Sequence, residues 1–296
     1  TGTLQHPETL LQPTILQRFK QSFMSDETVH IVTQQDLMAK NVTSQNTVNS
    51  WQFTATDIPD MAFGVSDHFV WDGCSVVVDD ATGRRAVANA AYNDTASDYH
   101  YVAQYARHSL NWLSHNWPGV PYPYEKTTVF QGYAGMEYPM ICFNYGRTDE
   151  DGTYSSRTKY GMIGVIIHEV GHNFFPMIIN SDERNWSWMD EGLNTFVQFL
   201  TEQEFDNNYP SQRGPAHKIV DYMKMPKDQL EPIMTNSENI INFGPNAYAK
   251  PATGLNILRE TIMGRELFDY AFKEYCNRWA YKHPAPADFF RTMEDA

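Results

Sequence analysis

The sequence predicts an α+β fold in which strands come first and helices dominate afterwards. Runs that alternate apolar and polar side chains, as half-buried strands do, gather in the first third of the chain. Apolar residues at helical spacing prevail after about residue 93. With 296 residues and 42% apolar side chains, the chain is long enough for two units with a packed core. We therefore expect a division into residues 1–92 and 93–296.

The strands of the first part are expected at residues 29–33, 51–55, 61–65 and 74–78. Each combines β-branched or aromatic residues with turn residues at its ends. A cluster of Asp, Thr and Gly at residues 79–83 predicts a turn after the last of them. The remainder of this part is expected to be loop.

The second part opens with a predicted helix that Thr95 or Ser97 can cap and that runs to about Trp117. Prolines at 118, 121 and 123 prevent its continuation. Two further strands are expected, followed by four helices. The strands are expected at residues 127–130 and 140–143. The first helix is expected to begin at Tyr160, and the other three are expected to span about residues 192–205, 252–263 and 267–279.

Charge and composition exclude several classes of function. The formal net charge is 22 − 36 = −14, which is unfavourable for binding nucleic acid or an anionic membrane surface. The sequence contains no run of about 18 apolar residues, so it predicts no membrane-spanning helix. The start at Thr1-Gly2-Thr3 indicates a piece of something longer. The three cysteines form no CxxC pair, so we expect buried thiols, although one disulfide is compatible with their number.

Residues 168–172 read His-Glu-Val-Gly-His. On a helix, His168 and His172 lie on one face and can reach one metal ion, while Glu169 can accept a proton from water beside it. The motif alone could also be two surface histidines beside a solvated glutamate. That alternative requires a polar helix face, whereas residues 162–167 are strongly apolar.

A third ligand follows at the right distance. Catalytic zinc needs three protein ligands and an open position. Eighteen residues separate His172 from Glu191, which directly precedes the expected helix 192–205. Asp190 competes for this role but lies about 100° round a helix from Glu191. We therefore expect one zinc ion per chain, held by His168, His172 and Glu191, with Glu169 as the general base.

This pattern, with Glu191 inside Trp-Met-Asp-Glu-Gly, resembles the gluzincin aminopeptidases, the family of aminopeptidase N and the leukotriene hydrolase. A second segment, Gly135-Met136-Glu137-Tyr138-Pro139, is similar to the exopeptidase signature of that family, usually GAMEN, with Tyr138 in place of Asn. The resemblance implies an edge strand in which Gly135, Met136 and Glu137 line the substrate cleft and Glu137 binds the free α-amine.

A third segment, Asn246-Ala247-Tyr248-Ala249-Lys250, is similar to the Y-x-K segment of the same family. The resemblance implies that Tyr248 stabilises the tetrahedral oxyanion. It also implies a thermolysin-like, mostly helical zinc peptidase domain with a small edge sheet at 93–296, preceded by the last strands of a β domain. Flanking domains of the parent protein are then expected to pack against this chain.

The expected function is zinc-dependent aminopeptidase activity on peptides. Four alternatives remain open at this point: an endopeptidase, another zinc hydrolase on the same site, a zinc-stabilised binding module, and a piece that is inactive in isolation. The Gly-Met-Glu-Tyr-Pro variant looks like that of exported bacterial members, which favours an exported protein.

Overall fold

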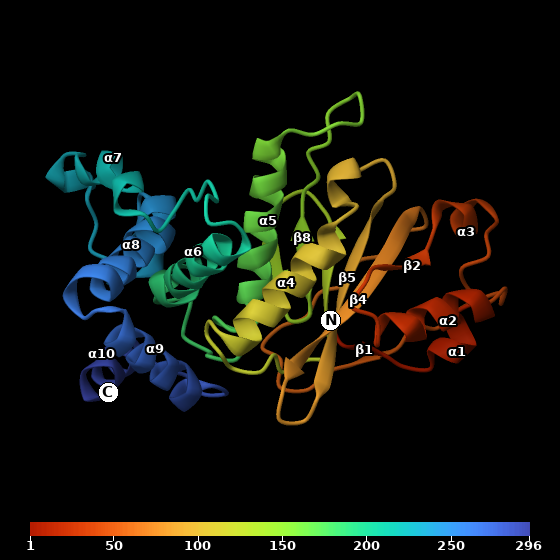
Figure 1. Ribbon diagram of the computed structural model, residues 1–296, viewed down its shortest axis with the longest axis horizontal. Helices are drawn as coiled ribbons and strands as arrows, with labels where there is room; N and C mark the ends of the chain where they lie inside the picture. Colours follow the sequence, from red (N-terminus) through yellow and green to blue (C-terminus); the bar gives the residue numbers. More distant parts are fainter. The chain divides into compact units, whose positions relative to one another are not determined.

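The computed structural model describes residues 1–296, which form two compact units (Figure 1). The first comprises Thr1–Asn111 and Pro121–Val170, and the second comprises Trp112–Val120 and Gly171–Ala296. The expected α+β class is confirmed, since a mixed sheet and many helices are both present. The expected boundary at residues 92/93 stays a prediction of domain organisation.

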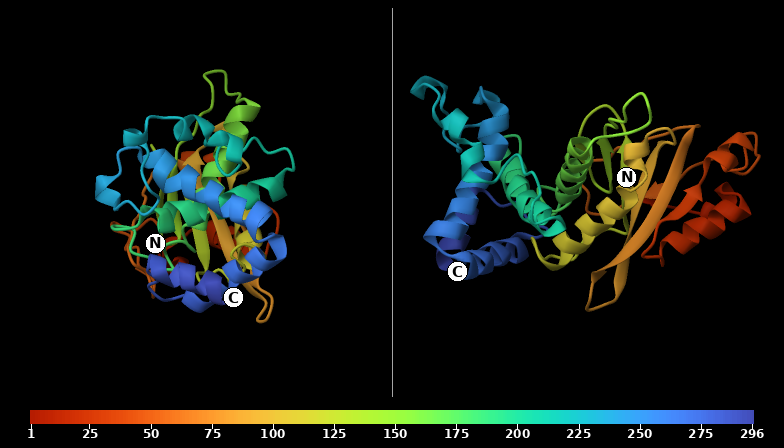
Figure 2. Two further views of the ribbon diagram at one scale, coloured as in Figure 1. Left: turned by 90° about the vertical axis from the view of Figure 1, so that its left-hand side faces the viewer. Right: turned by 45° about the horizontal axis from the view of Figure 1, so that its top comes forward.

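A six-stranded mixed sheet is the framework of the first unit. Its strands, in spatial order, are β2 (Val29–Val32), β4 (Phe69–Asp79), β5 (Arg84–Asn93), β6 (Lys126–Gln131), β8 (Ile141–Asn144) and β7 (Met136–Tyr138). The long β4–β5 hairpin, orange in Figure 2, is antiparallel. β5 and β6 are parallel, because α4 (Val102–His115) returns the chain between them. β7 is an edge strand, as the resemblance implied.

The start of the chain differs from its expected strand-and-loop character. It contains α1 (Pro7–Leu10), α2 (Pro13–Ser22) and α3 (Gln34–Met38), and a small separate sheet of β1 (Thr3–Leu4) and β3 (Phe53–Thr54). α2 packs against β2, where Ile15 and Ile31 share a buried apolar cluster. The strand expected at residues 61–65 is wrong: Met61, Phe63 and Val65 are exposed and form no ladder.

The helix that carries the histidine motif is α5 (Ser156–Gly171), which begins four residues before the expected start at Tyr160. A short 3-10 turn, η1 (Ser97–Tyr99), precedes α4 in the sequence. From Met162 to Val170 almost every residue of α5 is buried. The motif therefore lies on a helix that is enclosed on most sides.

The second unit is helical. Its elements are η2 (Trp188–Gly192), α6 (Leu193–Phe205), η3 (Ala216–Lys218), α7 (Val220–Met223), η4 (Lys227–Gln229), η5 (Ser237–Asn239), η6 (Gly244–Ala249), α8 (Lys250–Ile257), η7 (Leu258–Ile262), α9 (Arg265–Trp279) and α10 (Pro286–Asp295) (Figure 1). η2, η6 and η7 are π-helical turns. The core is aromatic: the ring of Phe272 packs 5.5 Å from that of Phe196 and 5.8 Å from that of Phe268.

None of these helices combines the length and the apolar character that crossing a membrane requires. The thiols of Cys74, Cys142 and Cys276 are all free and buried, as expected. Burial raises the pKa of the Cys74 thiol to about 12 and that of Cys276 well above its usual range. Burial also raises the pKa of the Cys142 thiol well above its usual range, and the carboxylates of Glu169 and Glu137 raise this pKa further.

Candidate metal centre

The residues of the His-Glu-Val-Gly-His motif lie at the C-terminal end of α5. His168 and Glu169 are in its last turn, and His172 follows directly after the helix ends at Gly171. Their exposed fractions are 8% for His168, 5% for Glu169 and 1% for His172. Burial at this level excludes the alternative of two surface histidines beside a solvated glutamate.

The ring of His172 has a fixed orientation. Its Nδ1 lies 2.7 Å from the carbonyl oxygen of Phe175, which can only accept a hydrogen bond. Nδ1 therefore carries the proton, and Nε2 keeps its lone pair for a metal ion. This is the arrangement that orients metal-binding histidines in general.

The two candidate carboxylates lie on opposite sides of this ring. Glu191 Oε2 is 3.3 Å from His172 Nε2, whereas Asp190 Oδ1 is 3.1 Å from Nδ1. Glu191 thus faces the nitrogen that has a lone pair, and Asp190 faces the nitrogen that carries the proton. The geometry favours Glu191 as the ligand and gives Asp190 a supporting contact to the ring.

A glycine permits a close approach of α6 to the backbone at residue 171, within the second unit. A Cβ atom at Gly171 would collide with Oδ1 of Asn194, which follows Glu191 by three residues. The π-helical turn η2 carries Glu191 into α6 at this point, and π-helical turns often occur at functional sites. The close contact at Gly171 therefore determines how near Glu191 comes to His172.

The donor set fits zinc. His168, His172 and Glu191 each offer a ligand atom, and these atoms lie within 4.8 Å of one another. Imidazole nitrogens and a carboxylate oxygen are ligands that catalytic zinc uses, and three of them leave one position open. A lone pair and a carboxylate that face each other at 3.3 Å repel unless a cation lies between them.

Tyr248 lies beside the same carboxylate. Its hydroxyl donates a hydrogen bond of 2.6 Å to Glu191 Oε1. The close packing of η6 and α8 against Gly192 allows this contact, since a Cβ there would lie 2.5 Å from Pro251 Cγ and 3.0 Å from the carbonyl oxygen of Ala247. Burial and the Glu191 carboxylate raise the pKa of Tyr248, so its hydroxyl is a donor at neutral pH.

The Gly-Met-Glu-Tyr segment lies against α5 within the first unit. A Cβ at Gly135 would be 2.5 Å from Glu169 Oε1, so the backbone there touches the carboxylate. β7 follows at once, with Met136 half exposed and Glu137 opposite Cys142 of β8. The segment and Glu169 are therefore neighbours, as a shared substrate site requires.

One residue at the site carries no signal in the sequence. The guanidinium carbon of Arg213 lies 4.2 Å from the ring centroid of Tyr248. Arg213 belongs to the loop after α6, which has no periodic pattern and no recognisable motif. The carbonyl of Phe175 also escapes sequence reasoning, because any residue supplies the same backbone oxygen.

Comparison with known proteins identifies relatives. Endoplasmic reticulum aminopeptidase 1 of Mus musculus is 24% identical over 193 residues, which are 59% of this chain and 20% of the mouse protein. Glutamyl aminopeptidase of Homo sapiens is 20% identical over 221 residues, which are 72% of this chain and 22% of the human protein. The chain thus spans about a fifth of the length of these curated relatives.

The M1 zinc metallopeptidase from Deinococcus radiodurans has a similar solved structure, with a TM-score of 0.55 and 16% identity. The similarity covers 76% of this chain and 48% of that one, and it supports the fold. The peptidase family M1 domain matches residues 93–296, which contain every candidate site residue named above. Because this match covers more than half of the sequence, the chain belongs to peptidase family M1.

Proposed function

We propose that this chain carries the catalytic centre of a zinc-dependent aminopeptidase, which removes N-terminal residues from peptides. The observation that supports it most is the pairing of His172 Nε2 with Glu191 Oε2 at 3.3 Å, with the proton held on Nδ1 by Phe175. Membership of family M1 and the aminopeptidase names of the relatives support the same conclusion.

His168, His172 and Glu191 would hold the ion. When bound, zinc supplies Lewis-acid chemistry, in that it polarises the scissile carbonyl and lowers the pKa of the attacking water. The hydrogen bond from His172 Nδ1 to Phe175 keeps the ligand nitrogen deprotonated.

Glu169 is the general base in this proposal. It is buried next to His168 on α5 and is not needed as a ligand. Its carboxylate takes a proton from the attacking water and later gives that proton to the leaving amine. Contact with the backbone at Gly135 limits the positions that the carboxylate can adopt.

Tyr248 is the oxyanion donor in this proposal. In the structure its hydroxyl is protonated and directed at Glu191 Oε1, at the candidate metal ligand itself. A donor held at this place can turn to the oxygen of the scissile carbonyl as negative charge develops there.

Glu137 gives the reaction its exopeptidase character. A carboxylate that pairs with the α-ammonium of a peptide fixes the chain end, so cleavage occurs one residue in. Its place on the edge strand β7, directly after the backbone that touches Glu169, supports this role.

The first test is Glu169→Gln, which keeps the shape of the side chain and removes the base. The variant should bind about one zinc per chain, like the wild type, and lose about 10²- to 10⁴-fold in turnover of an aminoacyl reporter. Zinc content is measured by elemental analysis of the same samples. Substantial turnover by a zinc-loaded Glu169→Gln chain contradicts the assignment.

The second test compares a peptide that has a free amine with its N-acetylated form. Only the free peptide should be cleaved, and Glu137→Ala should raise KM for it. Equal cleavage of both identifies an endopeptidase, and turnover of neither by a zinc-loaded chain contradicts the proposal for this chain. The flanking domains and an exported location stay predictions from the resemblance.

A further inference from the structure

Arg213 is a cation within the second unit that the zinc motif does not include. Its guanidinium lies over the ring of Tyr248, 4.2 Å from the centroid. Burial lowers the pKa of Arg213, while Tyr248, Glu191 and Glu202 raise it. An arginine under these influences stays charged at neutral pH.

The loop that carries Arg213 is fixed immediately after it. Gly214 has φ +102°, a conformation that favours glycine, and a Cβ there would lie 2.5 Å from Cγ of Phe199 on α6. The carbonyl oxygen of Gly214 accepts a hydrogen bond of 3.3 Å from Asn256 Nδ2 on α8. The loop is thus held between α6 and the helix that follows Tyr248.

The loop is also fixed just before Arg213. Ser211 Oγ donates a hydrogen bond of 2.5 Å to Oε2 of Glu202, a residue of α6 that is only 4% exposed. Gln203 Nε2 donates to Ser211 Oγ at 3.2 Å. With contacts at residues 211 and 214, the backbone has little freedom where the Arg213 side chain leaves it.

We propose that Arg213 is a positioning residue for Tyr248: it holds the phenol ring by a cation–π contact and makes its hydroxyl a stronger donor to the reaction's oxyanion. This inference rests on the proposed function and extends it to a residue outside the family motifs. The Glu191 carboxylate attracts the hydroxyl at 2.6 Å in the resting site. A positive charge over the ring draws electron density from the hydroxyl, which makes it a stronger donor, and limits the ring's alternative rotamers.

The expected effect is on kcat rather than on KM, because the oxyanion exists only in the transition state. Arg213→Ala should lower kcat about 5- to 30-fold, the range that a buried cation–π contact can supply. Arg213→Lys keeps a cation and should recover part of this loss. In a Tyr248→Phe chain, which has no hydroxyl to aim, Arg213→Ala should change kcat less than 2-fold.

These four chains are compared with wild type for kcat and KM on an aminoacyl reporter at saturating zinc. Arg147→Ala is the matched control, because Arg147 stacks on Tyr145 at 4.1 Å but lies outside the site, and it should leave both constants unchanged. Additive losses in the double variant, or a rise in KM alone, overturn the positioning role.

If the wild-type chain shows no turnover, this contradicts the proposed function but does not bear on the contact between Arg213 and Tyr248. The contact is then tested by thermal unfolding of Arg213→Ala, Tyr248→Leu and the double variant, because Tyr248→Phe would keep a ring under the cation. The Tm losses of Arg213→Ala and Tyr248→Leu should be less than additive in the double variant if the two side chains stack in solution. Additive losses overturn the contact.

Discussion

The backbone of Gly135 lies against the carboxylate of Glu169, so that a Cβ atom at residue 135 would be only 2.5 Å from Glu169 Oε1. The edge strand that begins at Met136 and the helix that carries the zinc motif are therefore in contact through a glycine and the proposed base. Any larger side chain must move the carboxylate or the strand, and this gives the first prediction.

Gly135→Ala should lower kcat about 10- to 100-fold, since displacement of a catalytic group by about 1 Å can cost that much. Zinc content should stay that of the wild type. Gly161→Ala on α5 is the control: nothing lies within 4 Å of a Cβ there, and the change should stabilise the helix by about 0.5–1 kcal/mol. Full activity of the Gly135→Ala chain contradicts the contact.

Gly171→Ala should destabilise the chain by about 1–3 kcal/mol, because the new Cβ collides with Asn194 Oδ1 in a tightly packed region. Zinc affinity should fall with it, since Glu191 lies in η2, which continues directly into α6. Urea unfolding and zinc titration measure both effects. Adding Asn194→Ala removes the colliding atom, so the double variant should be more stable than the sum of the two single losses, and simple additivity refutes the collision.

The ligand and its neighbour should respond differently to substitution. Glu191→Gln removes a ligand, so zinc should no longer raise Tm, whereas free zinc at 100 times Kd stabilises the wild type by about 2.7 kcal/mol. Asp190→Asn weakens a contact to the other ring nitrogen and should reduce zinc affinity about 10- to 100-fold without abolishing it. The opposite order of effects makes Asp190 the ligand.

Glu202 predicts a pH dependence of stability. Burial raises the pKa of its carboxyl to about 7, above the ordinary 4.5 of the unfolded chain. Between these values the folded chain binds more protons, so the free energy of unfolding falls as pH rises from about 4.5 to 7. The loss in the free energy of unfolding over this range is on the order of 3 kcal/mol, and the loss is complete above about pH 7.

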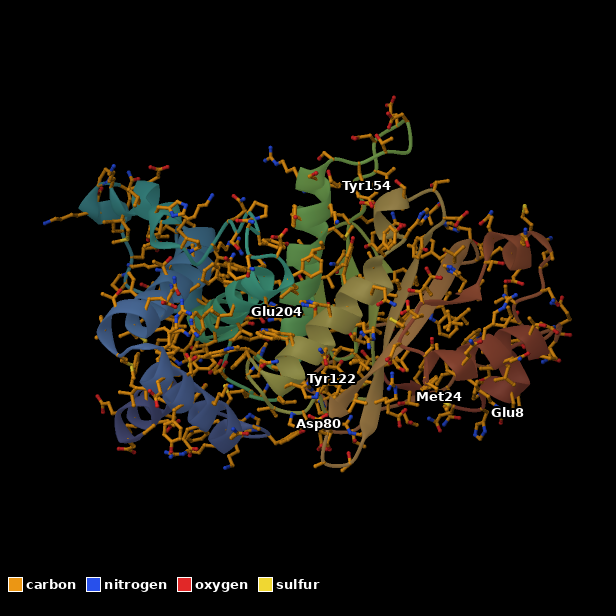
Figure 3. All side chains as sticks on the ribbon, in the orientation of Figure 1. Glu8, Met24, Asp80, Tyr122, Tyr154 and Glu204 are labelled. Atoms are coloured by element: carbon orange, nitrogen blue, oxygen red, sulfur yellow. The ribbon has the colours of Figure 1, made fainter.

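Glu202→Gln removes this titration, so its metal-free unfolding should lose less stability between pH 4.5 and 8 than that of the wild type. Glu204→Gln is the control, since Glu204 lies exposed on the same helix and is labelled in Figure 3. Urea unfolding in a chelator separates the effect from zinc binding. Parallel pH profiles of wild type and Glu202→Gln refute the raised pKa.

Sequence reasoning succeeds where a side-chain pattern determines the structure. The apolar spacing predicted α6 and α9 to within two residues, because their buried faces repeat every turn. The motif indicated the helix, and the alternative of exposed histidines failed because the apolar residues 162–167 are almost all buried.

The local sequence does not predict the structure where tertiary contacts determine it. α2 is a mostly polar segment whose few apolar residues bury against β2, a partner that local sequence does not identify. η2 and η6 are π-helical, which no pattern distinguishes from α-helix. Arg213 reaches Tyr248 through a loop that Ser211 and Gly214 fix, and only the fold reveals these contacts.

The buried cysteines give this chain built-in probes of local opening. A thiol reagent reaches Cys142 only when the first unit opens around β8, because that residue is 1% exposed and pairs with Glu137 of β7. Cys276, fully buried on α9, reacts only when the helical unit opens. The ratio of the two labelling rates therefore compares, without any substitution, how often the sheet beside the strand proposed to hold the peptide's end opens with how often the helical unit opens.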